Sequence, residues 1–496
     1  MSARKRLSPE ILWLLLAFIF FFVWYTQIHP ISLFDGDDWR YVSDSRSAVP
    51  IWGAWNPSRI FPEIFMPLCS GAAAYVVYPL LGNYLQAMTL THGFVIAGFL
   101  TLYAWSFLRM MKRLFQISDA TAVFSCAFFL IGHFLIFRSE LTDNTYMLFC
   151  YDLTCYYYYL VPSAVNASLV MWMMGNPGFP EFLKSRSFAR KGLLFFLLYL
   201  AIFSNLPSSA ILAVYAGSVV LLRFFRYWKA GWKALLRENG FYLVILGIWL
   251  VSAVFELSGG RAAAAGNSLG IFARLKETVY YLLMLRFSVK KTFLAVCALI
   301  AAAAIVLLAR SRRQATIDKA FLTALILCLI AIAASGIYTV VLCAAVDYSY
   351  IWRSDYLFGM FFFSMLFVSL SFGYLLKKQP RFLYAVPILL CFLTSECTSV
   401  YSTYLESNAN NLDPAICDEI TQDMIDAVLR AEEAGLDEAV LEVPVFDTPD
   451  NWPIPTYTGE LLVNSLCEHN LLHRRIQVSI VPTAERNLEY RIPLAE

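Results

Sequence analysis

The sequence predicts an all-α polytopic membrane protein that carries a small α/β domain at its C-terminus. The 496-residue chain is 59% hydrophobic and only 15% charged, whereas charged residues make up about a quarter of a soluble globular domain. Apolar runs of about 18 residues or more recur from residue 11 to residue 397, and each is long enough to cross a bilayer as a helix. Beyond residue 397 the composition becomes that of a soluble domain.

The first apolar run, residues 11–28, follows the basic residues Arg4, Lys5 and Arg6. It is longer and bulkier than the hydrophobic region of a signal peptide, and it ends without a small-residue cleavage motif. We therefore expect a retained signal-anchor helix.

Clusters of lysine and arginine predict the orientation of the helices, because short cytoplasmic loops are enriched in both residues. The clusters fall at 4–6, 109–113, 184–191, 223–237, 310–319 and 377–381. Placing all of them inside gives about eleven crossings, a cytoplasmic N-terminus and an extracytoplasmic C-terminus. The predicted spans are 11–28, 87–108, 119–137, 157–174, 190–205, 207–225, 239–257, 292–309, 320–342, 355–376 and 382–397. We expect a multi-pass cell-membrane protein with a transmembrane domain at 1–398 and an extracytoplasmic domain at 399–496.

One further apolar run, residues 64–81, does not fit this count. A full crossing would move every later basic cluster to the other side of the membrane. Pro67, Gly71 and Pro79 also interrupt the run. We expect a half-inserted or surface-lying element that covers the preceding loop. The alternative is a true span with a compensating change near 141–150.

The outward loop at residues 29–63 holds the candidate catalytic residues. A solvated loop can carry acids without any function, but this loop is otherwise short of charge and follows the first span directly. Those features favour a functional cluster at the membrane surface. The selected residues are two acids as catalytic candidates, followed by cationic, aromatic and acidic candidates for substrate or phosphate binding: Asp37, Asp38, Arg40, Tyr41, Arg59 and Glu63.

Three other segments are predicted to face outward. Residues 138–159 end in four consecutive tyrosines, Tyr156 to Tyr159, which fit either an interfacial belt or an aromatic platform for a sugar. Residues 259–291 form a basic loop where the charge rule expects few cations, and residues 347–355 form the third segment. The side chains selected from the last two segments as phosphate ligands are Arg274, Lys276, Arg286 and Arg353.

Outward acids beside outward arginines predict a particular chemistry. A carboxylate can act as general base toward a hydroxyl or amine. A guanidinium presents a planar fork of donors that matches phosphate oxygens. The combination predicts group transfer from a lipid phosphate, with the acceptor attacking an anomeric carbon and the lipid phosphate leaving.

The stretch Asp37-Asp38-Trp39-Arg40-Tyr41 resembles the Asp-Glu-x-Arg-Tyr element of the GT-C glycosyltransferases. The later Trp55-Asn56-Pro57-Ser58-Arg59 and the short outer α/β tail look more like the bacterial branch that includes the phage-type O-antigen glucosyltransferases of the GtrII kind. The resemblance covers the general architecture and one short motif. It implies a GT-C-like fold and transfer of a sugar from a polyprenyl-phosphate donor to a cell-surface glycan, lipid or polymer acceptor.

Carried over by position, Asp37 falls on the first acid of the family pair, which is usually given the base role, and Asp38 falls on the second. The second acid is Asp here rather than Glu, which leaves open which of the two is the base. Arg40 and Tyr41 match the following positions and would shape the loop or contact phosphate.

Two other functions explain part of the pattern. An O-antigen-type polymerase or ligase would account for the basic loop at 259–291 but not for the acids after the first span. A transporter of lipid-linked glycan would place ionisable residues near the bilayer midplane, where the predicted spans carry few. No nucleic-acid partner and no cofactor is expected. Some GT-C members with pyrophosphate donors need a divalent metal, for which Glu140 and Asp143 would be the available ligands here.

Residues 399–496 predict a small α/β cap on the outer face. No lysine occurs beyond Lys378, and acids dominate from residue 406 to residue 450. The apolar pattern predicts helices at 414–434 and 459–472 and strands at 439–445 and 476–481, with Gly435 ending the first helix. The segment has no glycine-rich phosphate loop and no nucleophile motif, so no chemistry is assigned to it.

Overall fold

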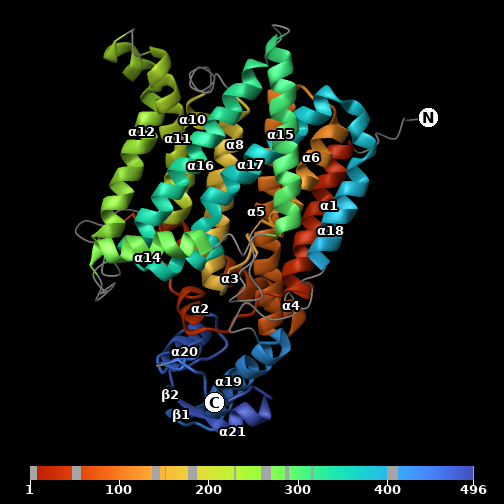
Figure 1. Cartoon of the computed structure of the whole chain (residues 1–496). Helices are drawn as coiled ribbons and strands as arrows, with labels where there is room; N and C mark the ends of the chain where they lie inside the picture. The colour runs from red at the N-terminus through yellow and green to blue at the C-terminus, as the bar shows by residue number, and fades with distance from the viewer. Residues whose placement is uncertain are drawn as a thin grey trace.

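The computed structural model describes residues 8–46, 57–136, 146–150, 152–176, 187–227, 231–258, 270–284, 290–313, 318–398, 412–448 and 450–494. This part of the chain is a bundle of helices with a small α/β unit at one end (Figure 1). Among the predicted site residues, Arg286 lies outside the described ranges, as do Glu140 and Asp143.

Several helices of the bundle begin at a polar side chain that accepts from a backbone N–H of the first turn, which would otherwise be unsatisfied. Asn83, for example, accepts from the Gln86 backbone N–H at 2.8 Å, and Asp318 accepts from that of Phe321 at 3.2 Å. The elements in chain order are α1 (Pro9–Val23), η1 (Trp24–Ile28), α2 (Gly36–Tyr41), α3 (Ile60–Ala72), η2 (Ala73–Val77), α4 (Tyr78–Leu81), α5 (Tyr84–Phe115), α6 (Asp119–Gly132), α7 (Leu153–Cys155), η3 (Tyr156–Leu160), α8 (Val161–Met174), α10 (Phe188–Ile202), α11 (Leu206–Tyr227), α12 (Trp232–Leu257), α14 (Ile271–Met284), α15 (Lys291–Arg313), α16 (Lys319–Ala345), η6 (Tyr348–Trp352), α17 (Ser354–Lys378), η7 (Pro380–Tyr384) and α18 (Val386–Thr398).

Eight described helices are long and apolar enough to cross a membrane, which supports the prediction of a polytopic helical membrane protein. They are Pro9–Ile28, Ile60–Leu81, Tyr84–Phe115, Leu206–Phe225, Leu236–Leu257, Lys291–Ser311, Lys319–Ala345 and Ser354–Lys378. A helix also lies at each of the other four predicted spans, but α6, α8, α10 and α18 have only 13 to 15 residues each. Several membrane crossings are therefore supported, but the predicted number of about eleven is not.

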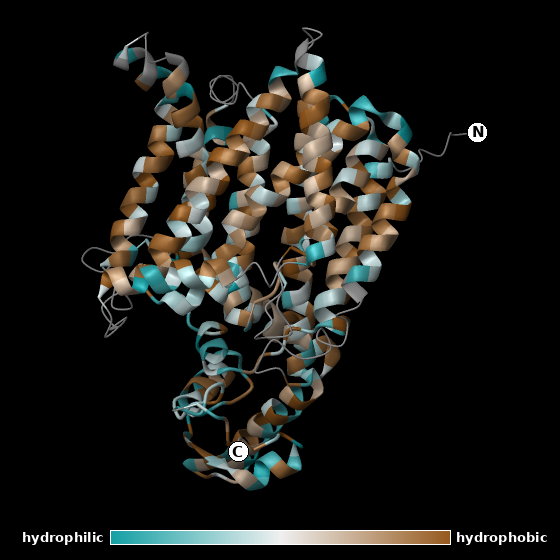
Figure 2. Ribbon diagram, viewed as in Figure 1, coloured by the Kyte–Doolittle hydropathy of each residue, from teal (hydrophilic) through white to brown (hydrophobic). Residues whose placement is uncertain are grey.

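The two ends of the bundle differ in what they carry. The C-terminal unit lies at one end, here called the cap side, and the N-terminus lies at the opposite end, here called the far side (Figure 1). Brown hydrophobic ribbon fills the region between them (Figure 2). Basic side chains gather on the far side, where Lys112 pairs with Glu10 at 2.7 Å and Lys377 pairs with Asp318 at 3.3 Å.

The interrupted run at 64–81 belongs to one continuous helical segment, α3–η2–α4, with Pro67 inside α3 and a π-helical turn at η2. It lies antiparallel to the start of α5, since Phe65 meets Phe99 at 5.6 Å and Ser70 lies 3.3 Å from His92. Its other contacts are on the cap side, where the Tyr75 hydroxyl donates to a carbonyl of the C-terminal unit. By length and composition the segment could span a membrane, so the half-inserted arrangement stays a prediction.

Helix α14 lies across the bundle on the cap side instead of along it (Figure 1). Its outer surface exposes apolar side chains, among them Phe272 and Leu283, while Tyr281 stacks on Tyr348 of η6 at 5.8 Å. A helix with an exposed apolar face in this position is typical of one that rests in the membrane interface. It occupies the described part of the predicted basic loop at 259–291.

The C-terminal unit is a small α/β assembly. It contains α19 (Pro414–Glu433), β1 (Glu438–Pro444), α20 (Thr458–Glu468), β2 (Gln477–Thr483) and α21 (Ala484–Glu489). The strands pair in parallel, from Glu438 opposite Gln477 to Pro444 opposite Thr483. These elements coincide with the predicted helices and strands, although α20 ends four residues early. Gly435 follows α19 with a φ of 72°, a left-handed conformation that suits glycine at a helix end.

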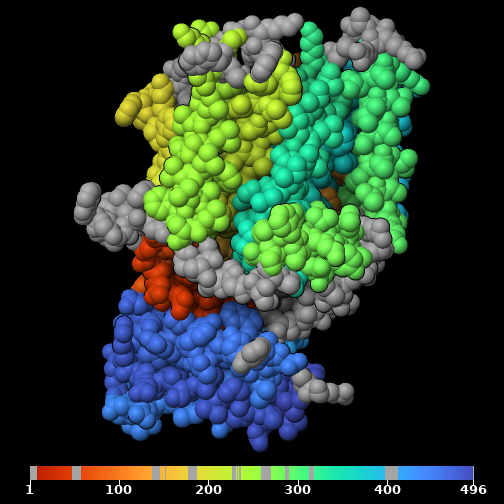
Figure 3. Space-filling model, turned by 60° about the vertical axis from the view of Figure 1, so that its left-hand side comes forward, coloured from red at the N-terminus to blue at the C-terminus, as the bar shows by residue number. Residues whose placement is uncertain are grey.

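Helix α2 lies between the bundle and the C-terminal unit (Figure 3). The Gly36 backbone N–H donates to the Pro453 carbonyl at 3.0 Å, and the Ser43 and Ser465 hydroxyls lie 2.9 Å apart. The Ser465 hydroxyl also bonds the carbonyl of Trp39, whose ring is fully buried. The C-terminal unit therefore holds α2 in place.

Candidate active site

The predicted acidic loop forms a short helix with its own cap. Asp35 precedes α2 and its side chain accepts from the Asp38 backbone N–H at 3.0 Å. Gly36 is required at the next position, because a Cβ there would lie 2.9 Å from the Thr458 hydroxyl and 2.9 Å from the Tyr457 ring. The sequence FDGDDWRY thus encodes a capped helical turn that fits closely against the C-terminal unit.

The two adjacent acids have different environments. Asp38 is fully buried, and its Oδ1 accepts from the backbone N–H of Thr154 at 2.7 Å and from the Thr154 hydroxyl at 2.8 Å. Asp37 is half-buried and forms no hydrogen bond or ion pair with any residue that the structure describes. Asp38 therefore anchors α2 to α7, and Asp37 is the more accessible of the two acids.

Asp38 belongs to a cluster of three carboxylates. One oxygen from each of Asp35, Asp38 and Asp152 lies within 4.8 Å of the others. Burial raises the pKa of Asp35 and of Asp38 well above the usual value, and the neighbouring carboxylates raise both further. Burial also raises the pKa of Asp152, to about 6. The cluster can therefore hold protons at mildly acidic pH.

The same three carboxylates are the described residues best placed to bind a divalent cation. However, the hydrogen bonds that these carboxylates make within the protein account for their positions without a metal ion. Asp35 caps α2, Asp152 caps α7 by accepting from the Cys155 N–H, and Asp38 joins the two caps through Thr154. The expectation of no resident metal stays a prediction, and among the described residues Asp35, Asp38 and Asp152 are the alternative ligands. Glu140 and Asp143 lie outside the described residues.

The tyrosine run forms the wall of the site. Tyr156, Tyr157 and Tyr158 are buried, so their interpretation as an interfacial belt is wrong. Tyr41, four residues after Asp37 and on the same face of α2, meets the Tyr158 ring at 5.1 Å. The Tyr158 hydroxyl donates to Glu63 at 3.0 Å. The tyrosines thus connect α2 to the start of α3.

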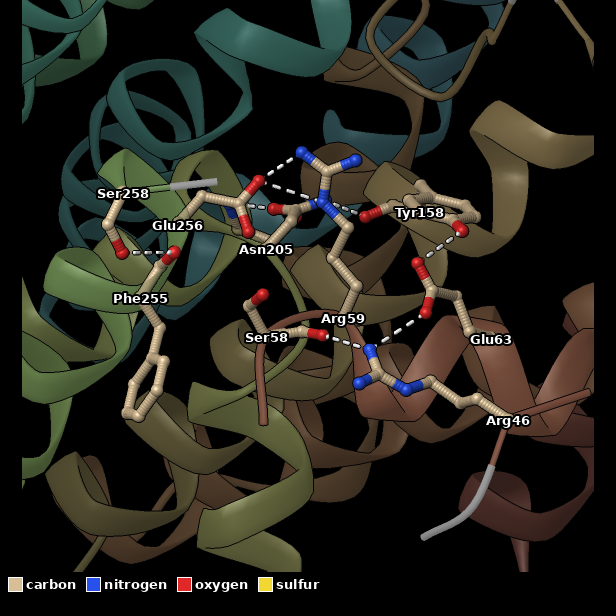
Figure 4. A network of polar contacts seen from close by, with 10 residues as sticks. Arg46, Ser58, Arg59, Glu63, Tyr158, Asn205, Phe255, Glu256 and Ser258 are labelled. Carbon is tan, nitrogen blue, oxygen red and sulfur yellow. Dashed lines mark hydrogen bonds and ion pairs between the residues drawn. The ribbon is translucent and has the colours of Figure 1, made fainter. Parts of the chain in front are cut away.

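Arg59 and Glu63 lie in one polar network with two further charged residues (Figure 4). Arg59 donates from Nε to Glu256 at 2.8 Å, and its guanidinium lies 5.8 Å from the Tyr158 ring centre. Arg46 binds Glu63 at 2.8 Å. Arg59 has a φ of 60°, the left-handed region that costs a non-glycine residue free energy. The network holds that turn and ties the end of α12 to the start of α3.

Arg353 lies on the other side of the tyrosine run. Its guanidinium grips Asp355 through two bonds, at 3.1 and 2.6 Å, and lies 5.2 to 5.4 Å from the ring centres of Tyr159, Tyr350 and Tyr356. Burial lowers the pKa of Arg353, but the Asp355 carboxylate outweighs burial and raises it above the usual value, so the side chain stays charged. The Arg353 charge also partly offsets the rise in the pKa of Asp152 that burial causes.

The remaining predicted phosphate ligands have fewer contacts with the rest of the candidate site. Arg40 is exposed on α2 and forms no ion pair with a described carboxylate. Arg274 donates to the Ala345 carbonyl at 3.0 Å at the end of α16, and Lys276 is exposed on α14. These two border the site only through η6, which α14 contacts. They are not brought together with α2 by any described contact.

Comparison of the chain with models of known protein families, with curated proteins and with solved structures finds no match. The residues themselves therefore carry the functional argument.

Four residues that organise the site received no role from the sequence: Asp152, Thr154, Glu256 and Asp355. Asp152 and Asp355 each stand next to a predicted feature, the tyrosine run and Arg353, and could have been selected as neighbours. Thr154 and Glu256 give no sequence signal, because their roles depend on partners 116 and 197 residues away.

Proposed function

We propose that this protein is a membrane glycosyltransferase that moves a sugar from a polyprenyl-phosphate donor to a cell-surface glycan, lipid or polymer acceptor. The cap side would be extracytoplasmic, since the basic residues of the far side fit the cytoplasmic enrichment of lysine and arginine. One observation carries the proposal. Asp37 is an accessible carboxylate on α2, which Asp38 anchors, and Tyr41 of the same helix packs on Tyr158 of the tyrosine run that joins Arg59 to Arg353.

In the proposed reaction, Asp37 removes the proton of the acceptor hydroxyl as general base. The acceptor oxygen forms a bond to the anomeric carbon of the sugar, and the bond from that carbon to the donor phosphate breaks. The polyprenyl phosphate departs with the electron pair. Arg40 and Arg353 would stabilise its negative charge, because guanidinium groups pair well with phosphate oxygens. The protonated Asp37 then returns its proton to solvent, and no metal takes part.

The arrangement fits a transferase better than the alternatives. A transporter needs ionisable groups along the pathway near the bilayer midplane, but the described acids and bases of the long helices stand near the helix ends, as Glu256 does in α12 and Asp355 in α17. A polymerase or ligase would rely on the basic loop, whose described residues Arg274 and Lys276 lack contacts with α2.

The test begins with the lipids that co-purify with the detergent-solubilised full chain. Mass spectrometry should find a polyprenyl phosphate or its monosaccharide. Asp37→Asn should retain the sugar-loaded donor, because the neutral amide cannot accept the acceptor proton, and membranes containing the variant should transfer less than about 1% of the labelled sugar that wild type transfers to envelope material.

Asp44→Asn is the matched control, since Asp44 is exposed three residues after α2, and it should transfer sugar as wild type does. Bulk phospholipid alone in the wild-type preparation would refute the donor class. Wild-type transfer by Asp37→Asn would refute the base assignment.

A further inference from the structure

A cavity lies on the far side of the bundle, away from α2. It has a volume of about 400 Å³, within the range of small-molecule sites. Five helices, α5, α8, α11, α12 and α16, form it. Its lining includes Leu114, Met173, Tyr215, Arg223, Tyr242 and Lys319.

The cavity is charged at one end and apolar at the other. Arg223 and Lys319 stand at the far-side ends of α11 and α16. Tyr215 and Leu327, which also line it, lie eight residues further into the same helices, or roughly 12 Å at the α-helical rise. Apart from the two cations, its walls are mostly aliphatic, thioether and aromatic. This gradient matches an amphiphile with an anionic head and an apolar tail.

The charges of Arg223 and Lys319 are not neutralised within the described part of the chain. Arg223 donates to the backbone carbonyl of Glu238 at 2.7 Å, and its guanidinium lies 5.2 Å from the Tyr242 ring centre. Neither contact neutralises it, and neither Arg223 nor Lys319 forms an ion pair with a carboxylate in the part of the chain that the structure describes. Of the neighbouring acids, the Glu238 carboxylate pairs with Arg237 at 3.5 Å and the Asp318 carboxylate pairs with Lys377 at 3.3 Å. The mouth of the cavity is therefore electropositive.

We propose that this cavity binds one anionic phospholipid, with its phosphate between Arg223 and Lys319 and one acyl chain between the helices. Basic pockets between membrane helices on the side rich in lysine and arginine are suited to anionic lipid head groups. A zwitterionic lipid fits less well, because its own ammonium group would approach the same two cations. The site is independent of the proposed transferase activity.

Native mass spectrometry of the full chain with dioleoyl phosphatidylglycerol and dioleoyl phosphatidylcholine at equal concentrations tests the proposal. We expect selective binding of one phosphatidylglycerol. The double variant Arg223→Gln with Lys319→Gln should lose about tenfold or more of that affinity, because charge-assisted hydrogen bonds to the phosphate are lost. Ala320→Phe, at the exposed mouth of the cavity, should block entry while both charges remain.

The matched control is Arg190→Gln with Arg381→Gln, which removes two exposed charges from the same side outside the cavity. It should bind the lipid as wild type does. Equal binding of the two lipids, loss in the control as large as in the double variant, or wild-type affinity in Ala320→Phe would overturn the proposal.

Discussion

Replacing Asp152 by Asn should make the protein more stable at neutral pH. Burial raises the pKa of Asp152 to about 6 from a usual 3.8, so the folded protein holds a proton between pH 4 and 6 that the unfolded chain releases. Stability therefore falls as the pH rises through this window and stays lower above it. The shift corresponds to about 3 kcal/mol at pH 7. Asn removes this cost and keeps the oxygen that caps α7.

The assay is the apparent unfolding temperature of the detergent-solubilised full chain, followed by tryptophan fluorescence from pH 4 to pH 7.5. The difference between Asp152→Asn and wild type should be largest above pH 6.5 and should shrink toward pH 4. A lower unfolding temperature of the variant at pH 7.5 would refute the reasoning. If a chelator then also destabilised wild type, a divalent cation rather than protons would hold the three carboxylates together.

Three other substitutions test separate parts of the structure. Gly36→Ala should lower the free energy of unfolding by about 1–3 kcal/mol, because its Cβ would overlap Thr458 and Tyr457. It should also make the C-terminal unit more susceptible to proteolysis. Gly71→Ala, where a Cβ meets nothing within 4 Å, is the control and should unfold at the wild-type temperature. Glu256→Gln should cost about 2–3 kcal/mol in thermal unfolding by leaving Arg59 unpaired in a half-buried site, and a double variant with Arg59→Gln that recovered none of the loss would contradict this pairing. Arg353→Lys keeps the charge but loses the planar fork and the ring contacts, so it should lower the polyprenyl phosphate that co-purifies with the protein, whereas Arg381→Lys should leave it unchanged.

The helices could be predicted from hydropathy, because a residue's free energy of transfer into lipid depends on its own side chain and not on distant parts of the chain. Each predicted span coincides with a helix, and the two strands of the C-terminal unit are where the alternating pattern placed them. The crossing count was less predictable, since α6 and α18 are shorter than the apolar runs that contain them. Whether segment α3–η2–α4 crosses the membrane stays a prediction, since it is long and apolar enough to do so.

The candidate site could be located from the sequence but not resolved into roles. The sequence alone does not distinguish the role of Asp37 from that of Asp38. On a helix of 3.6 residues per turn, however, neighbouring side chains point about 100° apart, so Asp38 bonds Thr154 while Asp37 bonds no described residue. The run Tyr156 to Tyr158 was misread because its burial depends on α2 and α3, which come from distant parts of the chain.

The docking of α2 onto the C-terminal unit also fixes an order of events during biosynthesis. Residues 36–41 emerge from the ribosome early, whereas their partners Pro453 and Ser465 emerge last. Until then the Trp39 carbonyl lacks its Ser465 partner, and the capped turn has no support on that side. The acidic helix therefore reaches its final packing only when the chain is nearly finished, and a copy that stops short of α20 would be inserted in the membrane with its candidate catalytic helix still unsupported.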